Sequence, residues 1–78
     1  MYDPVILFIN EFVLSNGIQI AEHTWRYKAI EVNNWNGLIE VMWGPRLNVY
    51  QRENEEPIYN AGNFDDLMVV YSGLTNVE

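Results

Sequence analysis

Few side chains in this sequence could carry out catalytic chemistry. His23 is the only histidine and there is no cysteine, which excludes a paired-histidine metal site and a thiol nucleophile. Neither Ser15 nor Ser72 lies in the glycine-flanked pattern of a nucleophile elbow. The five glycines occur singly, so none forms a phosphate-binding loop. We therefore predict a protein that is not an enzyme and binds no cofactor.

Two groups of carboxylates are the next candidates. Glu53, Glu55 and Glu56 flank Asn54, a composition that Ca²⁺ can use, but the segment lacks the ligand spacing and central glycine of an EF-hand loop. Asp65 and Asp66 are adjacent, and adjacent residues of a helix point about 100° apart, so they do not share a site. We predict no metal site.

A third candidate is the segment from Trp25 to Lys28, where aromatic and basic residues alternate. Single-strand nucleic-acid binders combine such residues. In a strand, however, the rings would point to one face and the cations to the other, so stacking and phosphate contacts would not share a surface. The formal net charge of −7 also opposes non-specific attraction to phosphates. We predict no direct binding to nucleic acid.

Charge is distributed unevenly along the chain. All four lysines and arginines lie within residues 26–52, whereas residues 53–78 carry six carboxylates and no cation. The distribution of surface charge indicates which partners a protein can bind more than it indicates the fold. The acidic segment either serves only solubility or forms a functional acidic face. Such a face would favour a basic partner, such as a nucleic-acid-binding protein.

The acidic loop and the start of the C-terminal helix are separated by one short strand and a turn, so we expect them to be neighbours. Arginine pairs with carboxylates through two hydrogen bonds and stacks on aromatic rings. A dock for an arginine-rich groove would therefore combine these carboxylates with a tyrosine. The predicted partner-binding residues are Glu53, Glu55, Glu56, Tyr59, Asp65 and Asp66. In the alternative, a solvated loop and a helix cap account for the carboxylates separately.

The first half of the chain predicts strands joined by turns. Residues 4–14 could begin as a helix at Asp3-Pro4, but their β-branched and aromatic composition favours a strand. Residues 18–32 alternate in polarity, and each face changes character midway, which predicts a bulge or break at Glu22–Thr24. Residues 33–37 are expected to form a turn ending in Asn-Gly.

The second half predicts strands at 38–43 and 47–52, a short edge strand at 58–59, and a helix over 64–72 with Gly73 as its stop signal. The predicted fold is α+β: a small antiparallel meander of four to five strands with one short C-terminal helix. Seventy-eight residues make a single domain, 1–78.

These features together suggest a non-enzymatic inhibitor that occupies the cationic groove of a nucleic-acid-handling protein. Phage-encoded inhibitors of host defence, including anti-CRISPR and anti-restriction proteins, share this small, acidic, cysteine-free character; the analogy is one of size and charge. We expect no membrane segment and a cytoplasmic location, which would be the host cytoplasm for a phage protein. The alternative is an adaptor or a homodimer that docks through exposed aromatic residues such as Trp35 and Trp43.

Overall fold

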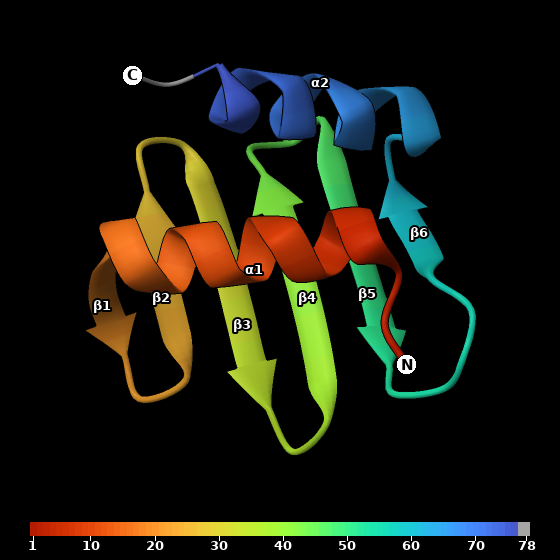
Figure 1. The fold of residues 1–78 in the computed structure, drawn as a ribbon, viewed down its shortest axis with the longest axis horizontal. Coiled ribbons are helices and arrows are strands. Elements are labelled where there is room, and N and C mark those ends of the chain that lie inside the picture. The colour runs from red at the N-terminus through yellow and green to blue at the C-terminus, as the bar shows by residue number, and fades with distance from the viewer. Residues whose placement is uncertain (77–78) are drawn as a thin grey trace.

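The structure, a computed structural model, describes residues 1–76; Glu78, the sixth carboxylate of the acidic segment, lies outside them. A six-stranded antiparallel meander in the order β1-β2-β3-β4-β5-β6 is preceded by one helix and followed by another (Figure 1). The elements are α1 (Pro4–Asn16), β1 (Ile18–Ala21), β2 (Thr24–Tyr27), β3 (Ile30–Trp35), β4 (Leu38–Trp43), β5 (Leu47–Arg52), β6 (Ile58–Ala61) and α2 (Phe64–Thr75). The α+β class and the antiparallel meander are confirmed, whereas four to five strands and a single helix are wrong.

Both helices cover the same face of the sheet. In Figure 1, α1 crosses the middle of the sheet and α2 runs beside it along one end. The core between these layers is formed by alternate residues of the central strands and by one stripe from each helix. Its buried members are Ile6, Ile9, Val13, Ile30, Val32, Ile39, Val41, Leu47, Val49, Leu67, Val70 and Leu74.

The N-terminal segment is a helix, not the expected strand. Asp3 caps it, because its Oδ1 accepts hydrogen bonds from the backbone N–H of Val5 (2.8 Å) and of Ile6 (3.4 Å). Ile6, Ile9 and Val13 recur at helical spacing and are fully buried. Burial of this stripe against the sheet outweighs the β-preference of the local composition, which is a weak determinant by comparison.

The region from 18 to 37 contains more turns than expected. The predicted break at Glu22–Thr24 is a turn at Glu22 and His23 that separates β1 from β2. A second turn follows at Lys28 and Ala29, where Lys28 adopts a positive φ of 56°. The predicted turn over 33–37 is confined to Asn36-Gly37, and residues 33–35 belong to β3. The extra turns divide the predicted long strand, which is why the sheet has six strands.

The second half matches the sequence more closely. Strands β4 and β5 have the expected bounds, and β6 and α2 are each longer than expected. Gly73 does not end α2. Its neighbour Leu74 is only 4% exposed, so packing of the last turn against the core keeps the helix intact through Thr75.

Strand alternation gives the sheet two different faces. The helix-covered face carries the core residues, and the opposite face, called here the open face, is not covered by either helix. Arg26 of β2, Glu31 of β3 and Met42 of β4 lie opposite one another in the register and belong to the open face. Arg26 therefore projects away from the helices.

Candidate functional site

Three turns lie side by side at the end of the sheet that is farther from α2 (Figure 1). They are the β1–β2 turn, the β3–β4 turn and the β5–β6 loop, and we call the surface that they form the acidic turn end. It carries four exposed carboxylates: Glu22, Glu53, Glu55 and Glu56. Because neighbouring strands lie about 4.8 Å apart, the surface extends over about 20 Å from the first turn to the last loop.

Buried Gln51 holds the acidic loop against the start of α1. Its Oε1 accepts a hydrogen bond from the backbone N–H of Asp3 at 2.9 Å, and its Nε2 donates to the carbonyl of Glu55 at 2.6 Å. The backbone N–H of Glu53 donates to the carbonyl of Gly37 at 3.1 Å, which ties the loop to the neighbouring turn. The loop carboxylates are thus exposed on a backbone that is anchored at several points.

A polar hollow of about 340 Å³ opens beside this loop. The Tyr2 hydroxyl donates to the carbonyl of Gly37 at 2.6 Å, and the N-terminal ammonium of Met1 contacts Oδ1 of Asn54. Partial burial and, after it, the negative charge of Glu53 raise the pKa of Tyr2. The hollow has a largely polar lining that consists of Met1, Tyr2, Asp3, Gln51, Asn54, Glu55, Glu56 and Pro57.

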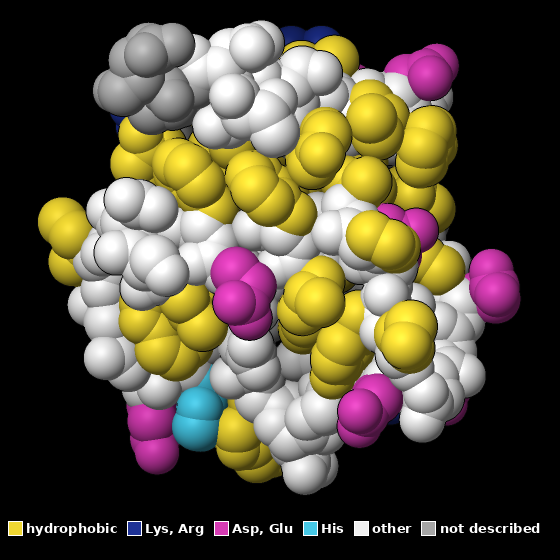
Figure 2. Space-filling model, viewed as in Figure 1, with side chains coloured by type: hydrophobic (Ala, Val, Ile, Leu, Met, Phe, Trp, Pro, Cys, Tyr) yellow, Lys and Arg dark blue, Asp and Glu magenta, His cyan; other side chains and the backbone are white. Residues whose placement is uncertain are grey.

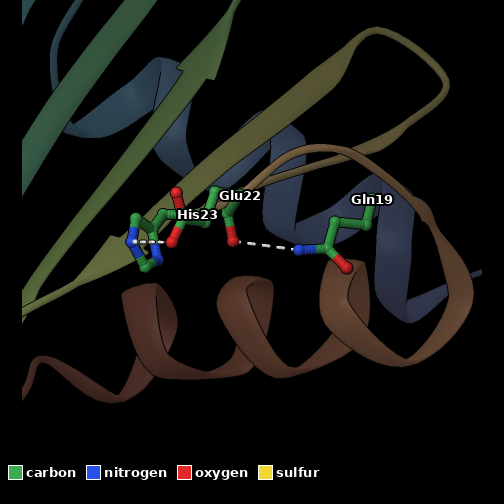
Figure 3. A network of polar contacts seen from close by, with 3 residues as sticks. All are labelled: Gln19, Glu22 and His23. Carbon is green, nitrogen blue, oxygen red and sulfur yellow. Dashed lines mark hydrogen bonds and ion pairs between the residues drawn. The ribbon is translucent and has the colours of Figure 1, made fainter.

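At the other end of this surface, Glu22 and His23 form the β1–β2 turn (Figure 3). Gln19 closes the turn from Nε2 to the carbonyl of Glu22 at 2.9 Å, and His23 Nε2 lies 3.7 Å from the Glu22 carboxylate. The His23 ring also lies against Trp35, with 5.4 Å between ring centroids. Trp35 is 59% exposed, so a carboxylate and an accessible aromatic surface are close together here.

The structure brings together only part of the predicted site. Glu53, Glu55 and Glu56 share the acidic turn end. Tyr59 is half-buried against the core, and burial, followed by the negative charge of Asp3, raises its pKa. Its ring therefore contributes mainly to packing.

Asp65 and Asp66 lie at the opposite end of β6, because four extended residues separate the two groups by about 13 Å. Asp66 donates its backbone N–H to the capping Asn63 at 3.1 Å, and its carboxylate lies 3.6 Å from Arg46 Nη2. The Arg46 guanidinium in turn lies 4.4 Å from the centre of the Trp43 ring. The geometry accounts for Asp66 as part of a capped helix end with its own cation.

Sequence reasoning did not include Glu22 in the candidate site, and it assigned Trp35 to the alternative aromatic surface. The sequence feature that could have identified Glu22 was the change in polarity pattern at Glu22–Thr24, where each face of the alternating segment 18–32 changes character. Had this been interpreted as a hairpin turn, an even number of antiparallel strands between Glu22 and Glu53 would have placed the two residues at the same end of the sheet.

Within residues 1–76, no group of three or more histidine, aspartate or glutamate side chains is arranged to hold a metal ion. Neither of the helices in this range has the length and apolar character needed to cross a membrane. The arrangement that is present can bind cations: carboxylates accept hydrogen bonds from guanidinium groups, and the Trp35 ring offers a face on which a guanidinium can stack.

In comparisons with known proteins, the chain matches no protein-family model, no curated protein and no solved structure.

Proposed function

We propose that this chain is a non-enzymatic binding protein that inhibits a nucleic-acid-handling protein by placing its acidic turn end in that partner's cationic groove. The observation that supports the proposal is the convergence of Glu22, Glu53, Glu55 and Glu56 on one end of the sheet. Arg52 is the one arginine or lysine of β5 and the following loop, and it belongs to the open face.

The anchoring of this surface supports binding rather than simple solvation. A carboxylate on a mobile loop must be ordered when it binds, and that ordering opposes association. Here Gln51 and Gly37 already fix the loop backbone through hydrogen bonds. Anchored carboxylates arranged over about 20 Å could replace a run of phosphates in a groove lined by arginine and lysine. A phage-encoded inhibitor acting in the host cytoplasm is the setting that this mechanism fits.

The test is a pair of double variants with the same change in charge. Glu55→Lys with Glu56→Lys reverses the centre of the acidic turn end. Glu11→Lys with Asp65→Lys reverses two exposed carboxylates on the helices. The tagged wild-type chain is first used to capture partners from bacterial lysate, and captured proteins are eluted with rising salt and then with heparin.

We expect the wild-type chain to retain a nucleic-acid-binding protein that heparin releases, because heparin competes for the same cationic groove. The Glu55/Glu56 variant should lose at least about 100-fold in affinity for that partner, whereas the Glu11/Asp65 variant should lose less than about fivefold. Equal losses in the two variants would show that net charge alone drives the binding, and unchanged binding of the Glu55/Glu56 variant would refute the proposal.

A second candidate function, self-association or docking through an apolar surface, is favoured by a different observation. Several large hydrophobic side chains outside the core are exposed, among them Ile18 (72%), Trp35 (59%) and Ile58 (44%). All three belong to the open face and not to the helices.

A further inference from the structure

Gly73 lies inside α2 and does not end the helix, so capping does not explain why a glycine occupies this position. Its φ is not positive, and a Cβ atom at this position would meet nothing within 4 Å. Glycine destabilises the interior of a helix relative to alanine, and an alanine would fit here without obstruction. The consequence of glycine at this position is that space beside the helix stays open.

That space belongs to a hollow of about 390 Å³ between α2 and the nearby end of the sheet, which we call the α2 hollow. Most of its exposed lining is apolar. Ligand sites are commonly hollows of about 300–1,000 Å³ with an apolar lining and a few polar groups. The α2 hollow is therefore large enough for a small ligand. Its lining includes Ile30 and Trp43 of the sheet, Val69, Val70 and Gly73 of α2, and Lys28 of the β2–β3 turn.

Two of the four cations of the chain flank the α2 hollow. Lys28 lines it directly, and the Arg46 guanidinium of the β4–β5 turn lies 4.4 Å from the centre of the Trp43 ring. Ile30 and Trp43 are opposite one another in the register, so the two turns lie side by side at this end of the sheet. In Figure 2, hydrophobic side chains gather along both helices, and the lysine and arginine side chains in view lie mainly at the margin beside α2.

The two cations differ in their ionic partners. Arg46 lies 3.6 Å from the carboxylate of Asp66. Within residues 1–76, no carboxylate lies within 4 Å of the Lys28 ammonium, which lies 5.5 Å from the centre of the Tyr27 ring. An apolar hollow with one such ammonium at its rim complements a molecule that has an apolar body and a single carboxylate.

We propose that the α2 hollow binds a small amphipathic carboxylate of the fatty-acid type. The acyl chain lies against Trp43, Val69 and the gap at Gly73, and the carboxylate lies at Lys28. Val69 is 51% exposed, so the acyl chain would cover an apolar side chain that otherwise faces water. The α2 hollow and the acidic turn end are at opposite ends of the sheet, and this inference does not depend on the proposed function of the acidic turn end.

The probes are butyrate, hexanoate, octanoate and decanoate, each used below the concentration at which it forms micelles. Octanol and octylamine have the chain length of octanoate and are neutral and cationic. The net charge of −7 and the C-terminal end of the α2 dipole would both favour octylamine, so the comparison tests whether Lys28 determines the choice. Calorimetry measures each dissociation constant, and the shift of the Gly73 amide signal in NMR spectra locates the bound probe.

We expect affinity to rise by up to about fourfold with each methylene from butyrate to octanoate, because each one leaves water. Octanoate should bind about fivefold more tightly than octanol, the scale of an exposed ion pair, and octylamine should bind more weakly than either. Lys28→Gln should abolish the preference for octanoate over octanol. Arg52→Gln, which removes the same charge at the opposite end of the sheet, should preserve it.

Gly73→Leu tests the space itself, because its side chain would occupy the α2 hollow. It should weaken octanoate and octanol alike by at least about tenfold. Leucine favours a helix more than glycine does, so the melting temperature should not fall, and the loss of binding cannot be attributed to a loss of fold.

Four results would overturn the proposal: no binding of octanoate or decanoate by the wild-type chain, equal affinities for octanoate, octanol and octylamine, wild-type binding of octanoate by Lys28→Gln, or wild-type binding by Gly73→Leu. Analytical ultracentrifugation adds a fifth. A wild-type dimer that Gly73→Leu converts to the monomer of 9.2 kDa would assign the α2 hollow to a second copy of the chain instead.

Discussion

Tyr59 is a single side chain whose titration reports on the packing beside the acidic turn end. Burial raises the pKa of its hydroxyl above the ordinary value of 10.0, and the negative charge of Asp3 raises it further. As pH rises, the unfolded chain therefore loses this proton before the folded protein does. The neutral hydroxyl contributes stability that is fully present below pH 10 and is lost as pH rises through the higher folded pKa.

The free energy of unfolding should accordingly fall as pH rises above 10.0, the ordinary pKa of tyrosine, and urea titrations at intervals from pH 8 upward would measure it. Tyr59→Phe removes the titrating group but keeps the ring, so its unfolding free energy should fall less steeply over the same pH range. Tyr2, whose pKa is also raised, would supply the remaining loss in that variant. An identical alkaline profile for wild type and Tyr59→Phe would contradict this explanation.

At the scale of elements, Gly62 determines how β6 is followed by α2. Its φ is +76°, and a Cβ atom at this position would lie 2.1 Å from the carbonyl oxygen of Arg46. Gly37 has a similar φ of +82°, but nothing lies within 4 Å of its virtual Cβ. The two glycines thus share a backbone conformation that favours glycine and differ only in the space around them.

Gly37→Ala should lower the free energy of unfolding by about 1 kcal/mol, the approximate penalty for an alanine with positive φ. Gly62→Ala should lower it by about 3 kcal/mol or more, because the β4–β5 turn must also shift away from the new methyl group. Chemical denaturation of both variants gives the comparison. Equal losses would mean that the contact between Gly62 and the Arg46 carbonyl relaxes without penalty.

The elements also show what sequence reasoning could and could not predict. Strands β4 and β5 follow from alternation that is uninterrupted between clear turn residues, and their predicted bounds are confirmed. The segment that became α1 satisfies both periodicities, since Val5–Ile9 suits a strand while Ile6, Ile9 and Val13 suit a helix face. Only the sheet that α1 covers decides between them, and that information is not local.

At the scale of the whole molecule, the candidate site also depends on information that is not local in the sequence. The acidic composition of residues 53–56 was sufficient to identify the loop as exposed and charged. Whether Asp65 and Asp66 lie beside this loop depended on the direction of β6. Because β6 is extended, it places the residues that follow it about 13 Å from the loop that precedes it. Glu22 and Glu53 share the acidic turn end only because four strands, β2 to β5, lie between them, and an even number of antiparallel strands returns the chain to the same end.

The concentration of carboxylates at one end of so small a protein should also reduce its stability. Glu53, Glu55 and Glu56 lie within four residues of one another on a chain that already carries −7, and like charges within a Debye length repel. The double variant Glu55→Lys with Glu56→Lys relieves this repulsion. Its melting temperature in low salt should therefore exceed that of wild type by about 2 °C, even though partner binding should be lost.

Raising the salt concentration to about 0.5 M should remove most of this difference, because the Debye length then falls to about 4 Å. Calorimetry or circular dichroism melts at both salt concentrations would measure it. The Glu11→Lys and Asp65→Lys variant has the same change in charge, but it should be less stable than wild type because it loses a favourable carboxylate in the first turn of α2. A higher melting temperature of the Glu55/Glu56 variant would show that these carboxylates weaken the fold, which fits the proposed binding role of the acidic turn end. A double variant less stable than wild type in low salt would instead mean that these carboxylates serve the fold.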